Sequence, residues 1–339
     1  MAPVTLRDVA AAAGVSVSTV SKVVRGQAKG AQLSDLTVER VRDMVVQLGY
    51  VPNQVARSLR AQSTRQIGLV LGSMAVPGVT ALTLNGGLLV GLSAAARECH
   101  LPAVVLYPQD DAMADPSPYL DGRIDGLLVR CPKPTDEALL RLLAPSHLPL
   151  VAVWSQAVLP GVGYCDVDHH GGAMLAVGHL LELGHRRVAY VGPPLNYDDP
   201  HFAGRYTGYQ QALQEAGVLP QPEWHVADGA ALLELLAGPE PVTAAFATTD
   251  LRAAALAADL ARAGLRIPEH LSLVGFDNLA SADHIAGGLT TIHQPIAEMA
   301  AQAVRNLVAL IGGAPAEECR TILPAYLVVR HSTARTAAV

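Results

Sequence analysis

The chain has 339 residues, half of them hydrophobic and 16% charged, which is typical of a well-packed globular protein and excludes a disordered one. The chain is too long for a single hydrophobic core of ordinary size, and its length fits a small module joined to a two-lobed domain. The net charge of −6 argues against a chain that contacts nucleic acid along its whole length, and no apolar run approaches the ~18 residues of a membrane span. The N-terminus carries no signal pattern, so we expect a cytoplasmic protein with no membrane partner.

Charge is distributed unevenly along the chain. The first 65 residues carry nine lysines and arginines against four acidic residues, a net charge of +5. Subtracting this from −6 leaves −11 on the remainder. A basic N-terminal segment ahead of an acidic body predicts that only this segment contacts phosphates.

Three short helices are predicted in the first 50 residues. Thr5 can cap the first, which ends at Gly14, and the third runs from Ser34 to a stop at Gly49. After a tight turn, Ser16 can cap the second. One face of this second helix presents hydroxyls and cations, namely Ser18, Ser21, Lys22 and Arg25. This is the plan of a helix-turn-helix, whose second helix suits phosphates and base edges in a major groove. The alternative is a small helical bundle with a solvated charged face.

The next segment, residues 50–60, is both basic and apolar. Pro52 and Asn53 stand at the start of a helix of about two turns, which is too short to be stable alone. It carries Leu59 beside Arg57 and Arg60. We expect it to order only against partners, namely a second copy of itself and a DNA minor groove, where an apolar side chain can separate two base pairs. A plain interdomain linker helix is the alternative.

From Gln66 onward, apolar strands alternate with helices. The expected strands are Ile67–Gly72, Ala103–Tyr107, Ile124–Val129, Leu150–Trp154, Tyr164–Val167, Val188–Gly192, Thr243–Thr248, Leu271–Phe276 and Leu289–Ile292. The expected helices include Gly172–Leu183, Gly204–Ala216, Leu251–Ala263 and Ile296–Ile311. Buried strands alternating with helices predict parallel sheets in a doubly wound α/β architecture, and this many strands favour two lobes.

Polar residues recur where these strands end. Ser155 follows Trp154, Thr249 and Asp250 follow the strand expected at 243–248, and Asp277 follows Phe276. Arg205 joins them at the start of the helix expected at 204–216. Because ligands of such folds bind at the carboxyl ends of strands, these side chains predict a hydrogen-bonding cleft between the lobes. Trp154 or Trp224 can stack on a sugar face, although a buried tryptophan is as often plain core.

Enzyme and metal motifs are absent from the sequence. It contains no dinucleotide-binding glycine motif, Walker loop or GxSxG motif, and its four scattered cysteines form no CxxC pair. His169 and His170 are adjacent and cannot face one way on a helix, which disfavours metal ligation. We therefore expect no catalytic activity, no metal and no cofactor.

The string Val4–Ser21 resembles the lactose-repressor (LacI/GalR) family of bacterial regulators closely, and residues 49–59 are similar to its hinge helix. Further blocks match along most of the chain, at Asp125–Leu128, Leu183–Val188, Val274–Asn278, Leu289–Ile292 and Val329–Thr333. The resemblance implies an all-α helix-turn-helix domain plus a periplasmic-binding-protein-like effector domain of two lobes joined by three crossovers. It also implies a homodimer on a near-palindromic operator in double-stranded DNA. The leucine-heptad tail of tetrameric relatives is missing, which favours a dimer.

The resemblance also assigns roles to individual positions. The base readers would be Val17, Ser18 and Lys22, the phosphate contacts Ser16, Thr19, Ser21 and Arg25, and the minor-groove wedge Leu59. The rest of the expected DNA-contacting set is Thr5, Leu6, Asn53, Val55, Ala56 and Arg57. Arg205 and Asp277 match the family's ligand-contacting pair, which binds sugar hydroxyls in many members. The full expected effector set is Trp154, Ser155, Arg205, Trp224, Thr249, Asp250 and Asp277. Thr249 and Ser155 depart from the residues common in relatives, which puts the identity of the ligand in doubt.

The expected domains are residues 1–49 for DNA binding, 50–64 for the hinge and 65–339 for effector binding and dimerisation. Within the last, we expect one lobe at about 65–161 and 293–322, and the other at about 162–292 and 323–339. The predicted function is a repressor of a catabolic or transport operon that a small-molecule effector releases from its operator. We favour a sugar as this effector. The alternatives are a regulator that responds to a nucleobase or other corepressor, and a sugar-binding protein whose helical head is an unrelated interaction module.

Overall fold

The computed structural model describes residues 4–29, 33–51, 63–71, 79–106, 115–131, 137–195, 197 and 199–336. Internal contacts divide the chain into two units, Met1–Thr64 and Arg65–Val339. The hinge helix predicted at residues 50–60 lies almost entirely outside the described residues. No described helix has both the length and the apolar character that crossing a membrane requires.

The described residues of the first unit form three helices, at the positions predicted. They are α1 (Leu6–Ala13), α2 (Val17–Val24) and α3 (Asp35–Gln47). Gly14 ends α1 in the left-handed conformation at φ 62°, and the hydroxyls of Ser16 and Ser34 accept backbone N–H groups at the starts of α2 and α3. The helices share one apolar core, formed by Val9, Ala10, Ala13, Val20, Val23, Val38 and Val41.

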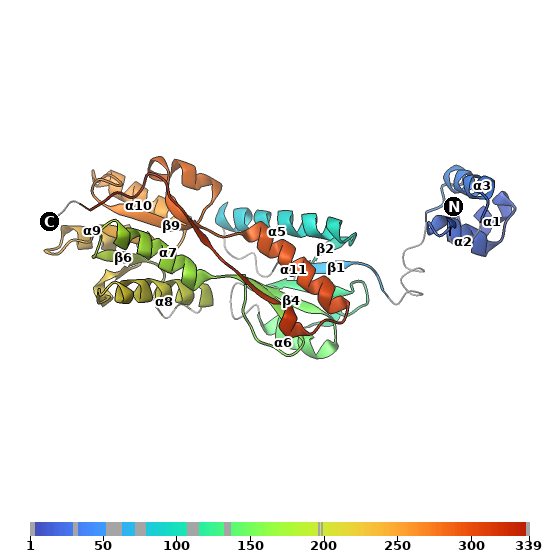
Figure 1. The fold of residues 1–339 in the computed structure, drawn as a ribbon, viewed down its shortest axis with the longest axis horizontal. Helices are drawn as coiled ribbons and strands as arrows, with labels where there is room; N and C mark the ends of the chain where they lie inside the picture. The colour runs from blue at the N-terminus through green and yellow to red at the C-terminus, as the bar shows by residue number, and fades with distance from the viewer. Residues whose placement is uncertain are drawn as a thin grey trace. The chain divides into compact units, whose positions relative to one another are not determined.

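The first lobe of the second unit contains a six-stranded sheet in the order β11-β5-β4-β3-β1-β2. Its strands are β1 (Ile67–Val70), β2 (Ala103–Leu106), β3 (Gly126–Arg130), β4 (Leu150–Val153), β5 (Val162–Val167) and β11 (Arg320–Leu323). All of its pairings are parallel. Helices α5 (Val79–Glu98) and α11 (Ile296–Ile311) lie side by side in Figure 1 and pack against each other, and the remaining helical segments are η2 (Ser117–Tyr119), α6 (Glu137–Leu143), η3 (Ala144–Ser146) and η6 (Ala316–Cys319).

The second lobe has a six-stranded sheet in the order β12-β10-β9-β8-β6-β7. Its strands are β6 (Val188–Val191), β7 (His225–Val226), β8 (Ala244–Ala247), β9 (Ser272–Asp277), β10 (Thr290–His293) and β12 (Tyr326–Val328), the last pairing antiparallel with β10. The helical segments are α7 (His169–Glu182), α8 (Pro200–Glu215), η4 (Pro222–Trp224), α9 (Gly229–Ala237), α10 (Asp250–Arg262) and η5 (Ala280–Gly287). In Figure 1, α7 and α8 lie on one side of this sheet and α10 on the other.

Alternate residues along a strand face the two helix layers, as a sheet buried on both sides requires. Tyr190 joins the apolar cluster that includes residues of α7 and α8, whereas its neighbours Ala189 and Val191 join the cluster that includes residues of α9 and α10. The larger cluster continues into the first lobe through Ile67 and Leu69, so the apolar core spans both lobes.

The chain passes between the two sheets three times, after β5, after β10 and after β11. The three expected crossovers and the α/β architecture are therefore confirmed. The expected start of the second lobe at residue 162 is wrong, because β5 pairs with β4 and β11 in the first sheet. The second lobe begins after Val167. All nine expected strands form, whereas β7, β11 and β12 were not predicted.

Candidate nucleic-acid interface and ligand site

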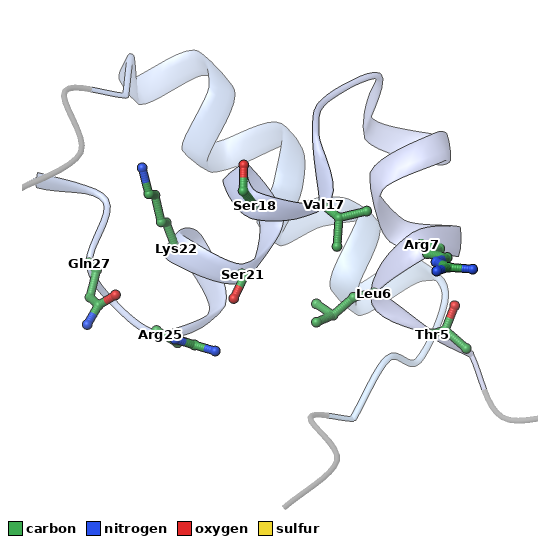
Figure 2. A pocket seen from close by; sticks show the side chains of 9 residues that line it. All are labelled: Thr5, Leu6, Arg7, Val17, Ser18, Ser21, Lys22, Arg25 and Gln27. Atoms are coloured by element: carbon green, nitrogen blue, oxygen red, sulfur yellow. The ribbon is translucent and has the colours of Figure 1, made fainter. Parts of the chain in front are cut away.

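The first unit carries an open groove of about 740 Å³. Figure 2 shows that its walls come from the start of α1 and from α2 with the turn that follows it. The lining residues are Thr5, Leu6, Arg7, Val17, Ser18, Ser21, Lys22, Arg25 and Gln27. Three of them are cationic and none is acidic, so the groove can receive an anionic backbone.

Hydroxyl groups gather at the N-terminus of α2. The Ser16 hydroxyl accepts the backbone N–H of Thr19 at 3.1 Å and lies 2.7 Å from the Ser18 hydroxyl and 2.8 Å from that of Thr19. The unsatisfied N–H groups and the positive end of the helix dipole at such a terminus favour a phosphate. Val17, between Ser16 and Ser18, has 42% of its surface exposed, and an exposed apolar side chain here can contact a thymine methyl group.

The structure brings together most of the described residues that were predicted to contact DNA. Thr5, Leu6, Val17, Ser18, Ser21, Lys22 and Arg25 all line the groove. Ser16 and Thr19 lie beside it at the cap of α2. Arg7 and Gln27 were missed, although the exposed cation of Arg7 directly after Leu6 was a usable signal. The hinge residues Asn53, Val55, Ala56, Arg57 and Leu59 lie outside the described residues.

The second unit holds a buried polar cluster where the β5, β8 and β9 strands end, which we define as Asp166, His169, His201, Arg205, Thr248, Asp277 and Gln294. Arg205 is its centre. The guanidinium donates to the Thr248 carbonyl and to His169 Nδ1 at 3.2 Å, and it lies 3.9 Å from Asp277 Oδ1. It also stacks 3.9 Å from the centre of the Phe276 ring.

Burial dominates the electrostatics of this cluster. Burial raises the pKa of Asp277 to about 7, against an opposing effect of Arg205 and with a further increase from Asp250. Burial also lowers the pKa of His169 to about 3, which leaves its ring neutral and able to accept from Arg205. Asp277 has φ 127°, a backbone conformation that is costly for a residue with a side chain and that concentrates at functional sites.

Several buried polar atoms of the cluster have no hydrogen-bond partner among the described residues. They are Asp277 Oδ2, Gln294 Oε1, Thr248 Oγ1, His169 Nε2 and His201 Nε2. Native proteins leave few such atoms, and each costs about 1–3 kcal/mol. Their concentration at one place indicates a site that a polar ligand completes.

An aromatic pocket of about 230 Å³ adjoins the buried polar cluster. Its walls include Tyr190, Tyr197, Phe202 and Tyr206. Phe202 also stands 5.2 Å from the Arg205 guanidinium, so it borders both the pocket and the cluster. The pocket is smaller than the roughly 300–1,000 Å³ of sites for drug-sized ligands and suits a single ring.

The remaining predicted effector residues have internal partners. Ser155 donates to Glu137 at 2.9 Å, and Arg130 stacks 4.9 Å from the Trp154 ring. Asp250 accepts the Thr291 hydroxyl on one oxygen and the Leu279 N–H on the other.

Thr249 caps α10 by accepting the Arg252 N–H. Trp224 packs partly buried against two apolar clusters, in line with the core alternative. Of the predicted set, only Arg205 and Asp277 belong to the buried polar cluster. The other five members were not predicted, namely Asp166, His169, His201, Thr248 and Gln294.

Comparison with known proteins gives matches along nearly the whole chain. Residues 5–53 match the family described as bacterial regulatory proteins, lacI family, and residues 177–333 match a periplasmic binding protein-like domain. The transcriptional regulator CelR of Thermobifida fusca is 33% identical over 97% of this chain and 98% of its own length. The repressor PurR of Haemophilus influenzae (strain PittEE) is 31% identical over 90% of both chains. The solved structure of the CelR–cellobiose complex superposes with a TM-score of 0.69 at 30% identity, over 97% of this chain and 99% of that one.

Proposed function

The chain belongs to the LacI family of bacterial regulatory proteins and is a DNA-binding transcriptional regulator, and from this premise we propose that it is a repressor released from its operator by a sugar. The groove of the first unit would lie on the major groove of DNA. The second unit would bind the sugar and has no catalytic role. As a regulator of transcription it would act in the cytoplasm, where the chromosome is.

The observation that carries the sugar proposal is the combination of partnerless polar atoms with an adjoining aromatic pocket. A sugar hydroxyl donates and accepts, so it can satisfy both Asp277 Oδ2 and the Arg205 guanidinium. A sugar ring also has an apolar face that packs on aromatic side chains such as Phe202. CelR, whose solved complex contains cellobiose, supports the same ligand class.

The same family membership supports a homodimer on a near-palindromic operator. Exposed apolar side chains support it on both lobes of the second unit. Leu89 and Val90 are exposed on α5, Val104 on the edge strand β2, and Leu251 at the start of α10. Burial of such side chains is a principal source of affinity in subunit interfaces.

Release from DNA requires the sugar to prefer the DNA-free arrangement of the two lobes. By linkage, a coupling of about 1–3 kcal/mol weakens operator binding about 5–150-fold. The buried polar cluster is suited to this role because Asp166 belongs to the first sheet, whereas Arg205 and Asp277 belong to the second lobe. A ligand that completes the cluster therefore contacts both lobes.

Calorimetric titration of the full chain with cellobiose and a panel of mono- and disaccharides tests the sugar site. We expect one sugar to bind with one site per chain. At pH values above about 7, where Asp277 is ionised, Asp277→Asn should weaken binding at least about tenfold, since a hydrogen bond to a charged group contributes about 1.5–3 kcal/mol. Asp283→Asn, which changes an exposed carboxylate of the same lobe, should leave the affinity unchanged. Binding of a nucleobase with no response to any sugar would replace this proposal by the corepressor alternative.

A further inference from the structure

We propose that Asp166, His169 and His201 form a binding site for a divalent transition-metal ion, with Zn²⁺ as its natural probe. The three residues come from different elements. Asp166 lies in β5 of the first sheet, and His169 and His201 lie in the first turns of α7 and α8. The metal site depends neither on DNA binding nor on the identity of the sugar.

Both imidazole rings direct Nε2 towards the same carboxylate oxygen. Asp166 Oδ1 is 3.6 Å from His169 Nε2 and 3.7 Å from His201 Nε2, and the two ring centres are 4.4 Å apart. One ligand atom from each residue can be chosen so that all three lie within 4.8 Å of one another. These separations are too long for hydrogen bonds between the residues themselves.

The separations suit a metal better than a bridging water. An ion about 2.1 Å from Asp166 Oδ1 and from either imidazole Nε2 would subtend an angle of about 120° between them at the observed 3.6 and 3.7 Å, near tetrahedral or trigonal values. A water about 2.8 Å from each atom would subtend only about 80° at 3.6 Å, which is strained for hydrogen bonding. Two imidazoles and one carboxylate favour zinc, cobalt, nickel or iron over magnesium or calcium.

The two imidazole nitrogens are also buried without partners. His169 is 5% exposed and His201 9%, and Nε2 of each has no hydrogen-bond partner among the described residues. A metal ion would satisfy both atoms at once and would leave at least one coordination position for a water or for a hydroxyl of a bound ligand.

Neighbouring groups hold two of the ligands in place. Asp199 lies 3.2 Å from His201 Nδ1, the carboxylate–histidine arrangement that commonly orients a metal ligand. Gln156 donates to Asp166 Oδ2 at 3.0 Å and the Val167 N–H donates to Oδ1 at 2.8 Å. The carboxylate oxygen that faces the histidines is therefore fixed in position and still has a lone pair to offer.

His169 behaves differently, because Arg205 donates to its Nδ1 at 3.2 Å. A metal on Nε2 displaces the proton from that atom, and the neutral ring then carries its proton on Nδ1. Arg205 must give up this contact and move towards Asp277, 3.9 Å away. Metal occupancy is thereby coupled to the Arg205–Asp277 pair, and the ion would tie the first sheet to the second lobe.

Equilibrium dialysis of the metal-free full chain against Zn²⁺, with Co²⁺ as a spectroscopic probe, tests the site. We expect one ion per chain and a visible absorption spectrum typical of tetrahedral or five-coordinate Co²⁺. His169→Gln and His201→Gln, prepared separately, should each weaken binding at least about 100-fold, because loss of even an orienting neighbour costs about 10–100-fold. His170→Gln, the adjacent histidine outside the cluster, should retain wild-type affinity.

Circular dichroism and thermal unfolding of the metal-free variants control for folding. If one histidine variant fails to fold, the other remains informative. Absence of bound Zn²⁺ and Co²⁺ in the wild type would overturn the proposal, and so would wild-type affinity in a folded His201→Gln or His169→Gln variant. A negative result would leave the sugar proposal standing, because calorimetry with sugars tests that proposal separately. A positive result would assign two of the partnerless atoms of the cluster to the metal ion.

Discussion

Asp277→Asn should alter the pH dependence of stability in a defined direction. Burial raises the pKa of this carboxyl from 3.8 to about 7 in the folded chain. At pH values between these two pKa values, Asp277 holds a proton in the folded state that it has lost in the unfolded state. The free energy of unfolding therefore falls as pH rises, because the folded state must either keep this proton or bury an ionised carboxylate. The total effect is about 4 kcal/mol, because each tenfold difference in proton affinity between the two states corresponds to roughly 1.4 kcal/mol.

The substitution keeps the shape of the side chain and an oxygen that can accept from Gln294, which donates to Asp277 Oδ1 at 2.6 Å. Arg205 also keeps its contacts with Thr248 and His169. We therefore expect the variant to fold. Relative to Asp277→Asn, the wild type should lose about 2.5 kcal/mol of unfolding free energy between about pH 5 and pH 7.5.

Urea unfolding followed by tryptophan fluorescence measures this difference in the second unit alone, because both tryptophans, Trp154 and Trp224, lie there. Asp283→Asn, at an exposed carboxylate, should reproduce the wild-type pH dependence. The reasoning is refuted if wild type and Asp277→Asn show the same pH dependence, or if the wild type gains stability relative to the variant as pH rises.

Three further tests use substitutions in other parts of the molecule. Lys22→Ala should reduce the difference in binding free energy between selected and scrambled duplexes by about 1–3 kcal/mol, as measured by fluorescence anisotropy. Arg25→Ala should instead weaken binding to both duplexes and lower the slope of log affinity against log salt by about one. Equal effects of the two substitutions would remove Lys22 as a base reader. Gly91→Ala should cost at least about 2 kcal/mol in urea unfolding, because its Cβ would meet the Ala297 backbone of α11. Gly86→Ala in the same helix has open space and should be neutral or stabilising. Val104→Asp on the exposed edge of β2 should shift the dimer towards monomer in analytical ultracentrifugation, and an unchanged mass would exclude this edge from the interface.

The sequence predicts the parts of the fold that depend on local patterns. Ser16, Gly14 and Ser34 mark helix ends through their own backbone and side-chain chemistry, and each acts as expected. Apolar runs likewise identify nine strands. By contrast, β7 has two residues and β12 three, so neither is long enough to show a periodicity.

The ligand site was only partly predictable for a different reason. Asp277 stands at the end of β9 and could be recognised from position. Arg205 was expected at the start of a helix, but α8 begins earlier, at Pro200, so Arg205 lies in its second turn. Asp166 and His201 are 35 positions apart and meet only because β5 and α8 converge. The sequence also does not reveal that Ser155 is already bound to Glu137, since that contact depends on how α6 packs.

The most direct test is the operator-binding isotherm of the full chain, measured by fluorescence anisotropy on a duplex selected from random sequence. At physiological salt we predict tight, salt-dependent binding of a dimer to a near-palindromic site, weakened about 5–150-fold by the sugar found by calorimetry. Equal affinity for selected and scrambled duplexes, or an isotherm that no sugar displaces, would contradict the account.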